Sequence, residues 1–202
     1  LPFTLTKAQI KVLREIHHDL KSPIQMNRLL QGDVGSGKTI VAMLTAAIII
    51  GHNSQVAVMA PTEILAEQHF TGLQKYCDLV NIKIVLLKGG ITGDERSSLL
   101  SNIKNGTAQL IIGTHALIQS DAIFKDLALI IVDEQHRFGV DQRKILIDKG
   151  YHPEVLAMTA TPIPRTLAIT YHGDMDVSVI DELPKGRKPI KTKVVTPGRL
   201  PK

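Results

Sequence analysis

Residues 32–39 read Gly-Asp-Val-Gly-Ser-Gly-Lys-Thr, which has glycine, lysine and threonine at the spacing of a phosphate-binding loop. Glycines let the backbone curl so that successive N–H groups face phosphate oxygens. Lys38 would reach the β- and γ-phosphates of a nucleotide, and Thr39 would offer its hydroxyl to Mg²⁺. We therefore expect the whole loop to bind a nucleotide, through Gly32, Asp33, Val34, Gly35, Ser36, Gly37, Lys38 and Thr39.

Two carboxylates follow an apolar run at residues 128–132. Asp133 closes this run and is the natural second ligand for Mg²⁺, through a bound water. Glu134 lies one residue further on, where it could turn toward the γ-phosphate, orient an attacking water and take its proton. With Lys38, these two carboxylates predict hydrolysis of a nucleoside triphosphate.

A pair of threonines, Thr159 and Thr161, follows a further apolar run and precedes Pro162. Hydroxyls at a strand end could link the phosphate-binding side of a sheet to another ligand by hydrogen bonds. Taken alone, the same residues form only a turn before a helix, stiffened by proline.

The elements that position these residues alternate between short apolar runs and amphipathic stretches. Several runs are continuous in Val, Ile and Leu, as in strands buried on both faces. This alternation predicts an α/β fold, a three-layer domain with a central, mostly parallel sheet. Because right-handed crossovers bring the loops after strands to one edge, the candidate residues should converge there. The expected strands are 26–31, 55–60, 82–87, 109–112, 128–132, 155–158 and 177–180, and the expected helices are 40–50, 62–79, 93–105, 140–149 and 164–170.

Length and composition favour one domain with a large core, since the chain has 202 residues and is 44% hydrophobic. No apolar run reaches transmembrane length, and no signal-peptide pattern opens the sequence. The single cysteine, Cys77, excludes an internal disulfide and fits a reducing cytosol. We therefore expect a cytoplasmic location.

The net charge of +5 is unevenly distributed along the chain. Residues 184–202 carry seven Lys or Arg and no acid, which leaves residues 1–183 with 17 basic and 19 acidic side chains. The last segment also contains Pro184, Pro189, Pro197 and Pro201, which predicts a linker that leaves a domain spanning residues 1–183. Basic tails attract phosphate backbones, but a solvated linker explains the same composition.

The order of motifs resembles the first RecA-like motor domain of superfamily 2 helicases, most closely the RecG-type, ATP-dependent DNA helicases. The matching segments begin with the loop and continue through Ala-Pro-Thr-Glu-Ile-Leu-Ala-Glu-Gln-His, Gly-Thr-His-Ala-Leu, Asp-Glu-Gln-His-Arg-Phe-Gly and Thr-Ala-Thr-Pro-Ile-Pro-Arg-Thr. The resemblance covers nearly the whole chain. A related double-stranded DNA translocase, the transcription-repair coupling factor, is the alternative, but its motif usually has Glu where this chain has Gln135.

The resemblance implies further roles that spacing does not show. Residues 1–20 match an N-terminal segment and helix that contact adenine, through Phe3 and Gln9. Gln135 and His136 would sense the nucleotide. Thr159 and Thr161 match a motif that couples hydrolysis to movement. The segments that would line the DNA track are Pro61-Thr62, Gly89-Gly90 and Thr114-His115. The implied cofactors are ATP and Mg²⁺, and the implied substrate is branched or double-stranded DNA, such as replication forks and recombination intermediates.

The resemblance also implies partner domains, so we expect the chain to be a piece of a longer protein. RecG-type helicases carry an N-terminal fork-binding region and a second RecA-like domain that supplies an arginine finger, so this domain alone should be weakly active or inactive. Aromatic residues make up only 3% of the chain, which favours contacts to phosphates and duplex shape over base stacking. Two other classes share the loop, namely a phosphotransferase and a nucleotide-dependent binding module without enzymatic activity.

Overall fold

The structure is a computed structural model that describes residues 2–161 and 175–182. In these residues the strands and helices alternate, as predicted. The helices are α1 (Lys7–Asp19), α2 (Lys38–Ile50), α3 (Glu63–Leu79), α4 (Gly93–Lys104) and α5 (Val140–Ile147), with short 3₁₀ helices η1 (His115–Ile118) and η2 (Gln135–Arg137). The strands are β1 (Asn27–Gly32), β2 (Gln55–Met59), β3 (Ile84–Leu87), β4 (Leu110–Gly113), β5 (Leu127–Val132), β6 (Glu154–Thr159) and β7 (Asp176–Ile180).

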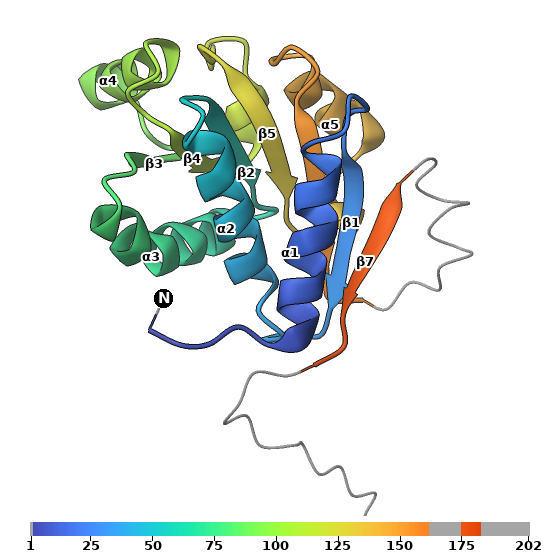
Figure 1. Ribbon diagram of the computed structural model, residues 1–202. Coiled ribbons are helices and arrows are strands. Elements are labelled where there is room, and N and C mark those ends of the chain that lie inside the picture. The colour runs from blue at the N-terminus through green and yellow to red at the C-terminus, as the bar shows by residue number, and fades with distance from the viewer. Residues whose placement is uncertain (1, 162–174, 183–202) are drawn as a thin grey trace, which may run out of the picture.

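The strands form one seven-stranded sheet in the order β3-β4-β2-β5-β6-β1-β7, and every pair in it is parallel. Helices cover both faces. Figure 1 shows α1 and α2 in front of the sheet and α5 behind it. The predicted three-layer α/β fold is therefore confirmed, and all strands end at the same edge.

The core lies on both faces of the sheet, which explains the continuous apolar runs. In β2, Val56 and Val58 pack with α1, α2 and α3 on one face, whereas Ala57 and Met59 pack with η1 and α5 on the other. All four side chains are buried. A strand buried on both faces needs no polar alternation, as the sequence pattern indicated.

The predicted element boundaries agree with the structure to within about two residues. The largest difference in the strands is β3, which begins at Ile84 and not at residue 82. The short 3₁₀ helices η1 and η2 were not predicted. The predicted helix 164–170 and linker 184–202 lie outside the described residues, so both remain predictions.

A buried arginine fastens α1 and β7 to β1 near the start of β1, at the edge of the sheet opposite the phosphate-binding loop. Arg28 in β1 donates from Nε to Asp19 Oδ2 at 2.6 Å and from Nη1 to Ser178 Oγ at 2.9 Å. The arginine side chain is only 9% exposed, so its charge depends on these partners. The cluster fixes α1, which carries Gln9, relative to the loop strand.

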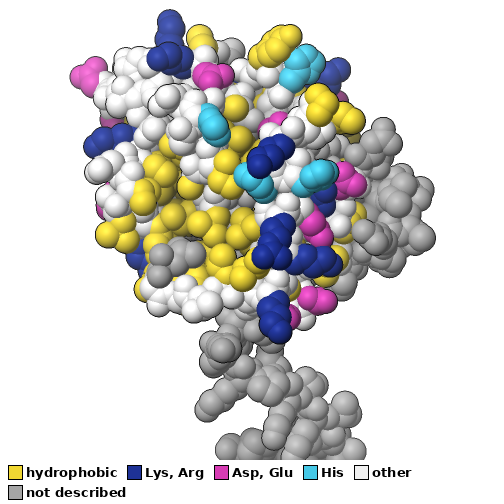
Figure 2. Space-filling view, in the orientation of Figure 1, with side chains coloured by type: hydrophobic (Ala, Val, Ile, Leu, Met, Phe, Trp, Pro, Cys, Tyr) yellow, Lys and Arg dark blue, Asp and Glu magenta, His cyan; other side chains and the backbone are white. Residues whose placement is uncertain are grey.

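Basic side chains gather on the exposed face of α1, where Figure 2 shows Lys, Arg and His side by side. The exposed residues of this face are Lys7, Lys11, Arg14, His17 and His18. Cys77, the single cysteine, is buried and free. Among the described residues, the structure contains no helix with the length and apolar character needed to cross a membrane.

Candidate nucleotide-binding site

The loop of residues 32–37 connects the end of β1 to the first turn of α2. Gly37 occupies the N-cap position with φ of 94°, in the left-handed region, and a Cβ there would lie 2.2 Å from Gln9 Nε2. A Cβ on Gly32 would lie 2.6 Å from Ser36 Oγ. The left-handed backbone at Gly37 therefore requires glycine, whereas a side chain at Gly32 would displace Ser36 and crowd Ile180. Because Gly37 offers no side-chain cap, the first N–H groups of α2 are available to an anion.

Lys38 lies over its own loop. Its Nζ atom donates to the carbonyl oxygens of Gly32 at 2.6 Å and Asp33 at 3.1 Å. Burial lowers the pKa of the Lys38 ammonium below its ordinary value, while the carboxylates of Glu134, Asp133 and Asp33 oppose this shift. The ammonium therefore lies at the loop and close enough to Asp133 and Glu134 to interact with their charges.

The two carboxylates leave the sheet directly after β5. Asp133 continues the pairing with β2, since its N–H donates to Met59 O at 2.9 Å. Its Oδ1 atom accepts the N–H of Glu134 at 3.0 Å. Glu134 has φ of 49° and ψ of 55°, a left-handed conformation that costs a non-glycine residue about 1–3 kcal/mol. This turn directs the chain into η2.

Gln9 connects α1 to the loop. Its Nε2 atom donates to Ser36 O at 2.8 Å, and its Oε1 atom accepts the N–H of Thr6 at 3.0 Å in a capping box. Gln9 is only 3% exposed. Phe3 lies in the segment before α1 and is 44% exposed. The structure therefore brings Gln9 to the loop and leaves Phe3 at the surface.

The remaining loop residues divide into exposed and buried positions. Val34 is 71% exposed, whereas Ser36 is 1% exposed and its Oγ finds no hydrogen-bond partner within the described residues. A buried hydroxyl without a partner, inside a cradle that Cβ atoms would fill, fits a loop that closes around phosphate oxygens.

Gln135 and His136 follow in η2. Gln135 is 2% exposed and donates from Nε2 to Met175 Sδ at 3.6 Å. This contact joins η2 to the residue that precedes β7. The side chain of His136 lies outside the described part of the structure.

The threonine pair lies beside the loop strand. Gln31 of β1 is in register with Thr159 of β6, so Thr159 lies next to the start of the loop. The Thr159 and Thr161 hydroxyls are 2.7 Å apart, and the N–H of Thr161 donates to Thr159 Oγ1 at 3.2 Å. The pair thus forms a closed turn at the edge that carries the nucleotide-binding residues.

The predicted DNA-track segments gather on the other half of the same edge, after β2, β3 and β4. Thr62 caps α3 by accepting the N–H of Leu65 at 3.3 Å. Gly89 donates from its N–H to Glu63 Oε1 at 3.3 Å, and a Cβ on Gly89 would lie 3.1 Å from His115 Nε2. The segments containing Pro61, Gly90 and Thr114 therefore lie close to one another.

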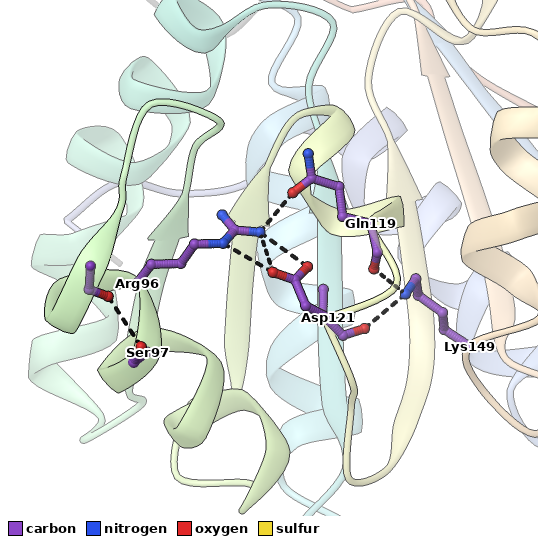
Figure 3. Close-up of polar contacts among 7 residues, drawn as sticks. Arg96, Ser97, Gln119, Asp121 and Lys149 are labelled. Atoms are coloured by element: carbon purple, nitrogen blue, oxygen red, sulfur yellow. Dashed lines mark hydrogen bonds and ion pairs between the residues drawn. The ribbon is translucent and has the colours of Figure 1, made fainter.

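Hydrogen bonds from Arg96 and Lys149 fix the segment that follows Thr114 and His115 (Figure 3). Arg96 of α4 donates from Nη2 to Asp121 Oδ2 at 2.8 Å and to Gln119 Oε1 at 2.6 Å. Lys149, just after α5, donates from Nζ to Gln119 O at 2.7 Å and Ala122 O at 2.8 Å. The network ties α4, the segment after η1 and the end of α5 together.

One residue that sequence reasoning missed is His69 of α3, whose Nε2 atom is 2.7 Å from Asp133 Oδ2. The available signal was a histidine in a helical stripe that contains the buried residues Ala66, Leu73 and Cys77. A polar ring in such a stripe needs a partner, although the pattern does not say which.

Comparisons with known proteins identify the family of the chain. Residues 6–170 match the DEAD/DEAH box helicase family. The ATP-dependent DNA helicase RecG of Streptococcus pneumoniae is 58% identical over 201 residues, which are 100% of this chain and 30% of that protein. RecG of Bacillus subtilis is 58% identical over 95% of this chain and 28% of its own length. The chain thus spans less than a third of these relatives.

Solved structures share the fold. A structure of RecG bound to a three-way DNA junction has a TM-score of 0.83 and 47% identity, covering 94% of this chain and 25% of that one. A DEAD box protein from Methanococcus jannaschii has a TM-score of 0.66 and 22% identity, covering 87% and 49%. The second likeness concerns the fold alone.

Proposed function

The chain belongs to the DEAD/DEAH box helicase family, and from this premise we propose that it is the ATP-hydrolysing motor domain of a RecG-type DNA helicase. The observation that carries the proposal is the meeting of Lys38, Asp133 and Glu134 at one sheet edge, beside the segments after β2, β3 and β4. The motor would couple hydrolysis to the remodelling of branched DNA.

The residues present fit ATP with magnesium. Thr39 would supply a hydroxyl and Asp133 a carboxylate, which are the oxygen donors that Mg²⁺ prefers when phosphates and waters complete its shell. When bound, the ion would neutralise charge that develops on the β- and γ-phosphates. Lys38 would hold the same phosphates, and Glu134 would orient the attacking water and accept its proton. Phe3 and Gln9 would contact the adenine, and the hydrogen bond from Gln9 to Ser36 O would connect that contact to the loop.

The proposed DNA track uses Pro61-Thr62, Gly89-Gly90 and Thr114-His115. Of these residues Thr62, Gly89, Gly90 and His115 are exposed, whereas Thr114 is buried. Exposed glycine turns and helix starts suit sequence-independent contacts to phosphates. The support from relatives is that a RecG structure containing a three-way DNA junction shares this fold at 47% identity.

We also propose that a second RecA-like domain and an N-terminal fork-binding domain complete the motor. Residues 1–183 would form the present domain, and residues 184–202 would lead out of it. The motor would act in the cytoplasm.

The test of this function is ATP hydrolysis by the full-length protein with and without branched DNA. We expect DNA to raise the turnover number at saturating ATP, because a motor completes its catalytic site on its track. A phosphotransferase with the same loop would show little stimulation by DNA. Equal turnover with branched DNA, duplex DNA and no DNA would therefore contradict the helicase function.

Replacing both threonines of the closed turn, Thr159→Ala with Thr161→Ala, should uncouple the motor. Neither residue is among the proposed phosphate or magnesium ligands, so DNA-stimulated hydrolysis should largely survive while fork remodelling falls sharply. The lost hydrogen bonds are worth about 1 kcal/mol each, which is too little to unfold the domain but enough to bias a conformational switch.

Both rates are measured on the same preparation, with Thr107→Ala, an exposed threonine, as the matched control. Equal loss of hydrolysis and remodelling, or loss of neither, would show that the pair is only a structural turn.

A further inference from the structure

His69 contacts the carboxylate that the proposed function assigns to magnesium. Its Nε2 atom is 2.7 Å from Asp133 Oδ2, and the two side chains are only 12% and 13% exposed. Because an ionised carboxylate only accepts hydrogen bonds, this contact requires the proton on Nε2 of His69. A short hydrogen bond shielded from water fixes the direction of the carboxylate.

The second oxygen of the same carboxylate is held from the other side. Asp133 Oδ1 accepts the backbone N–H of Glu134 at 3.0 Å, and the Asp133 N–H is itself paired with Met59 O. With one bond at each oxygen, the carboxylate plane cannot rotate freely. Each oxygen keeps a second lone pair, so a magnesium-bound water can still donate to it.

His69 also lies close to the other proposed magnesium ligand. A cavity of about 10 Å³ between α2, α3 and the sheet is lined by both Thr39 and His69, with Leu73 and other apolar side chains around them. The imidazole therefore reaches the site from the protein interior, behind the face that a nucleotide would occupy.

We propose that His69 is a positioning residue, which holds the Asp133 carboxylate in the orientation that a magnesium-bound water requires; this rests on the proposed function. Partners of this kind orient the groups around a metal, and losing one typically costs about 10–100-fold in metal affinity or activity. The helix that carries His69 starts at Glu63, directly after its cap Thr62 on the proposed DNA track. Two helical turns thus connect that track to the magnesium carboxylate.

The experiment compares His69→Gln with His69→Leu in the full-length protein. The two replacement side chains are similar in size, but only glutamine can donate to Asp133 from the position of Nε2. His52→Ala, an exposed histidine after α2, is the control. Thermal melting confirms that each variant folds. Calorimetry then measures ADP affinity over a series of Mg²⁺ concentrations and without metal, and steady-state hydrolysis is followed over the same series.

We expect His69→Leu to need about 10–100-fold more Mg²⁺ for half-maximal ADP binding and for half-maximal hydrolysis. Its metal-free ADP affinity should stay within about twofold of wild type, since the phosphate-binding loop is untouched. His69→Gln should recover most of the loss, and His52→Ala should behave as wild type. The same Mg²⁺ requirement in the Leu variant and wild type, or equal losses in the Gln and Leu variants, would overturn the role of His69.

The failure of this inference is distinguishable from failure of the proposed function. A wild-type protein that bound ADP with no dependence on Mg²⁺ would contradict the magnesium site itself, and the positioning role with it. A wild type with a clear Mg²⁺ requirement that His69→Leu does not change would contradict the positioning role alone.

Discussion

Glu134→Gln should abolish turnover in the full-length protein while leaving nucleotide binding intact. The amide has the shape of the carboxylate and can still hydrogen-bond a water, but it cannot take the proton that the attacking water must lose. General-base contributions of this kind are worth about 10²–10⁴ in rate, so the turnover number should fall by that factor. The left-handed backbone at this position, with φ of 49°, is equally costly for glutamine, so the comparison isolates the side-chain chemistry.

Single-turnover hydrolysis and ATP affinity are measured side by side for wild type, Glu134→Gln and Glu95→Gln. Glu95 is exposed in the first turn of α4, so its variant removes a charge without touching the site. A Glu134→Gln protein whose rate lay within about twofold of wild type would exclude the water-activating role. A large loss of ATP affinity would instead show that Glu134 shapes the site.

The fold could be predicted in class but not in strand order. Continuous apolar runs in 55–60 and 128–132 indicated strands buried on both faces, and the parallel seven-stranded sheet confirms this. The order β3-β4-β2-β5-β6-β1-β7 depends on which buried surfaces fit each other, and that information is not local in the sequence. Sequence relatives confirm the predicted resemblance to RecG-type helicases, since RecG of Streptococcus pneumoniae is 58% identical to this chain.

The candidate site, like the fold, could be predicted only in part from the sequence. The loop and the pair Asp133 and Glu134 could be identified because phosphate and magnesium chemistry require those residue types at that spacing. The family resemblance singled out Gln9 as an adenine contact, but the bond from Gln9 to Ser36 joins residues 27 positions apart and was not predicted. The His69 contact with Asp133 spans 64 positions and was missed, because a histidine in an apolar helical stripe is most often a core residue with a local partner.

The conformation of Lys38 explains why its charge should matter as much as the carboxylate chemistry. In the structure, its ammonium group donates to the loop carbonyls of Gly32 and Asp33, at 2.6 and 3.1 Å. A nucleotide would offer phosphate oxygens in place of these neutral acceptors. Charge-assisted hydrogen bonds are about twice as strong as neutral ones, so the exchange favours the bound state.

Lys38→Ala should therefore weaken binding of ATP with Mg²⁺ by about 10- to 100-fold, since hydrogen bonds to charged groups are worth about 1.5–3 kcal/mol. Turnover should fall further, because Lys38 would also stabilise charge on the γ-phosphate as the bond to the β-phosphate breaks. Lys38→Arg should recover little of the lost nucleotide affinity and turnover, because a planar guanidinium does not replace a compact ammonium inside a tight loop.

Calorimetry measures the affinities for ATP and ADP. Lys104→Ala, which replaces an exposed lysine at the end of α4, is the control for the loss of a positive charge. If Lys38→Ala and wild type bound both nucleotides with the same affinity, the loop at residues 32–39 would not be the nucleotide site.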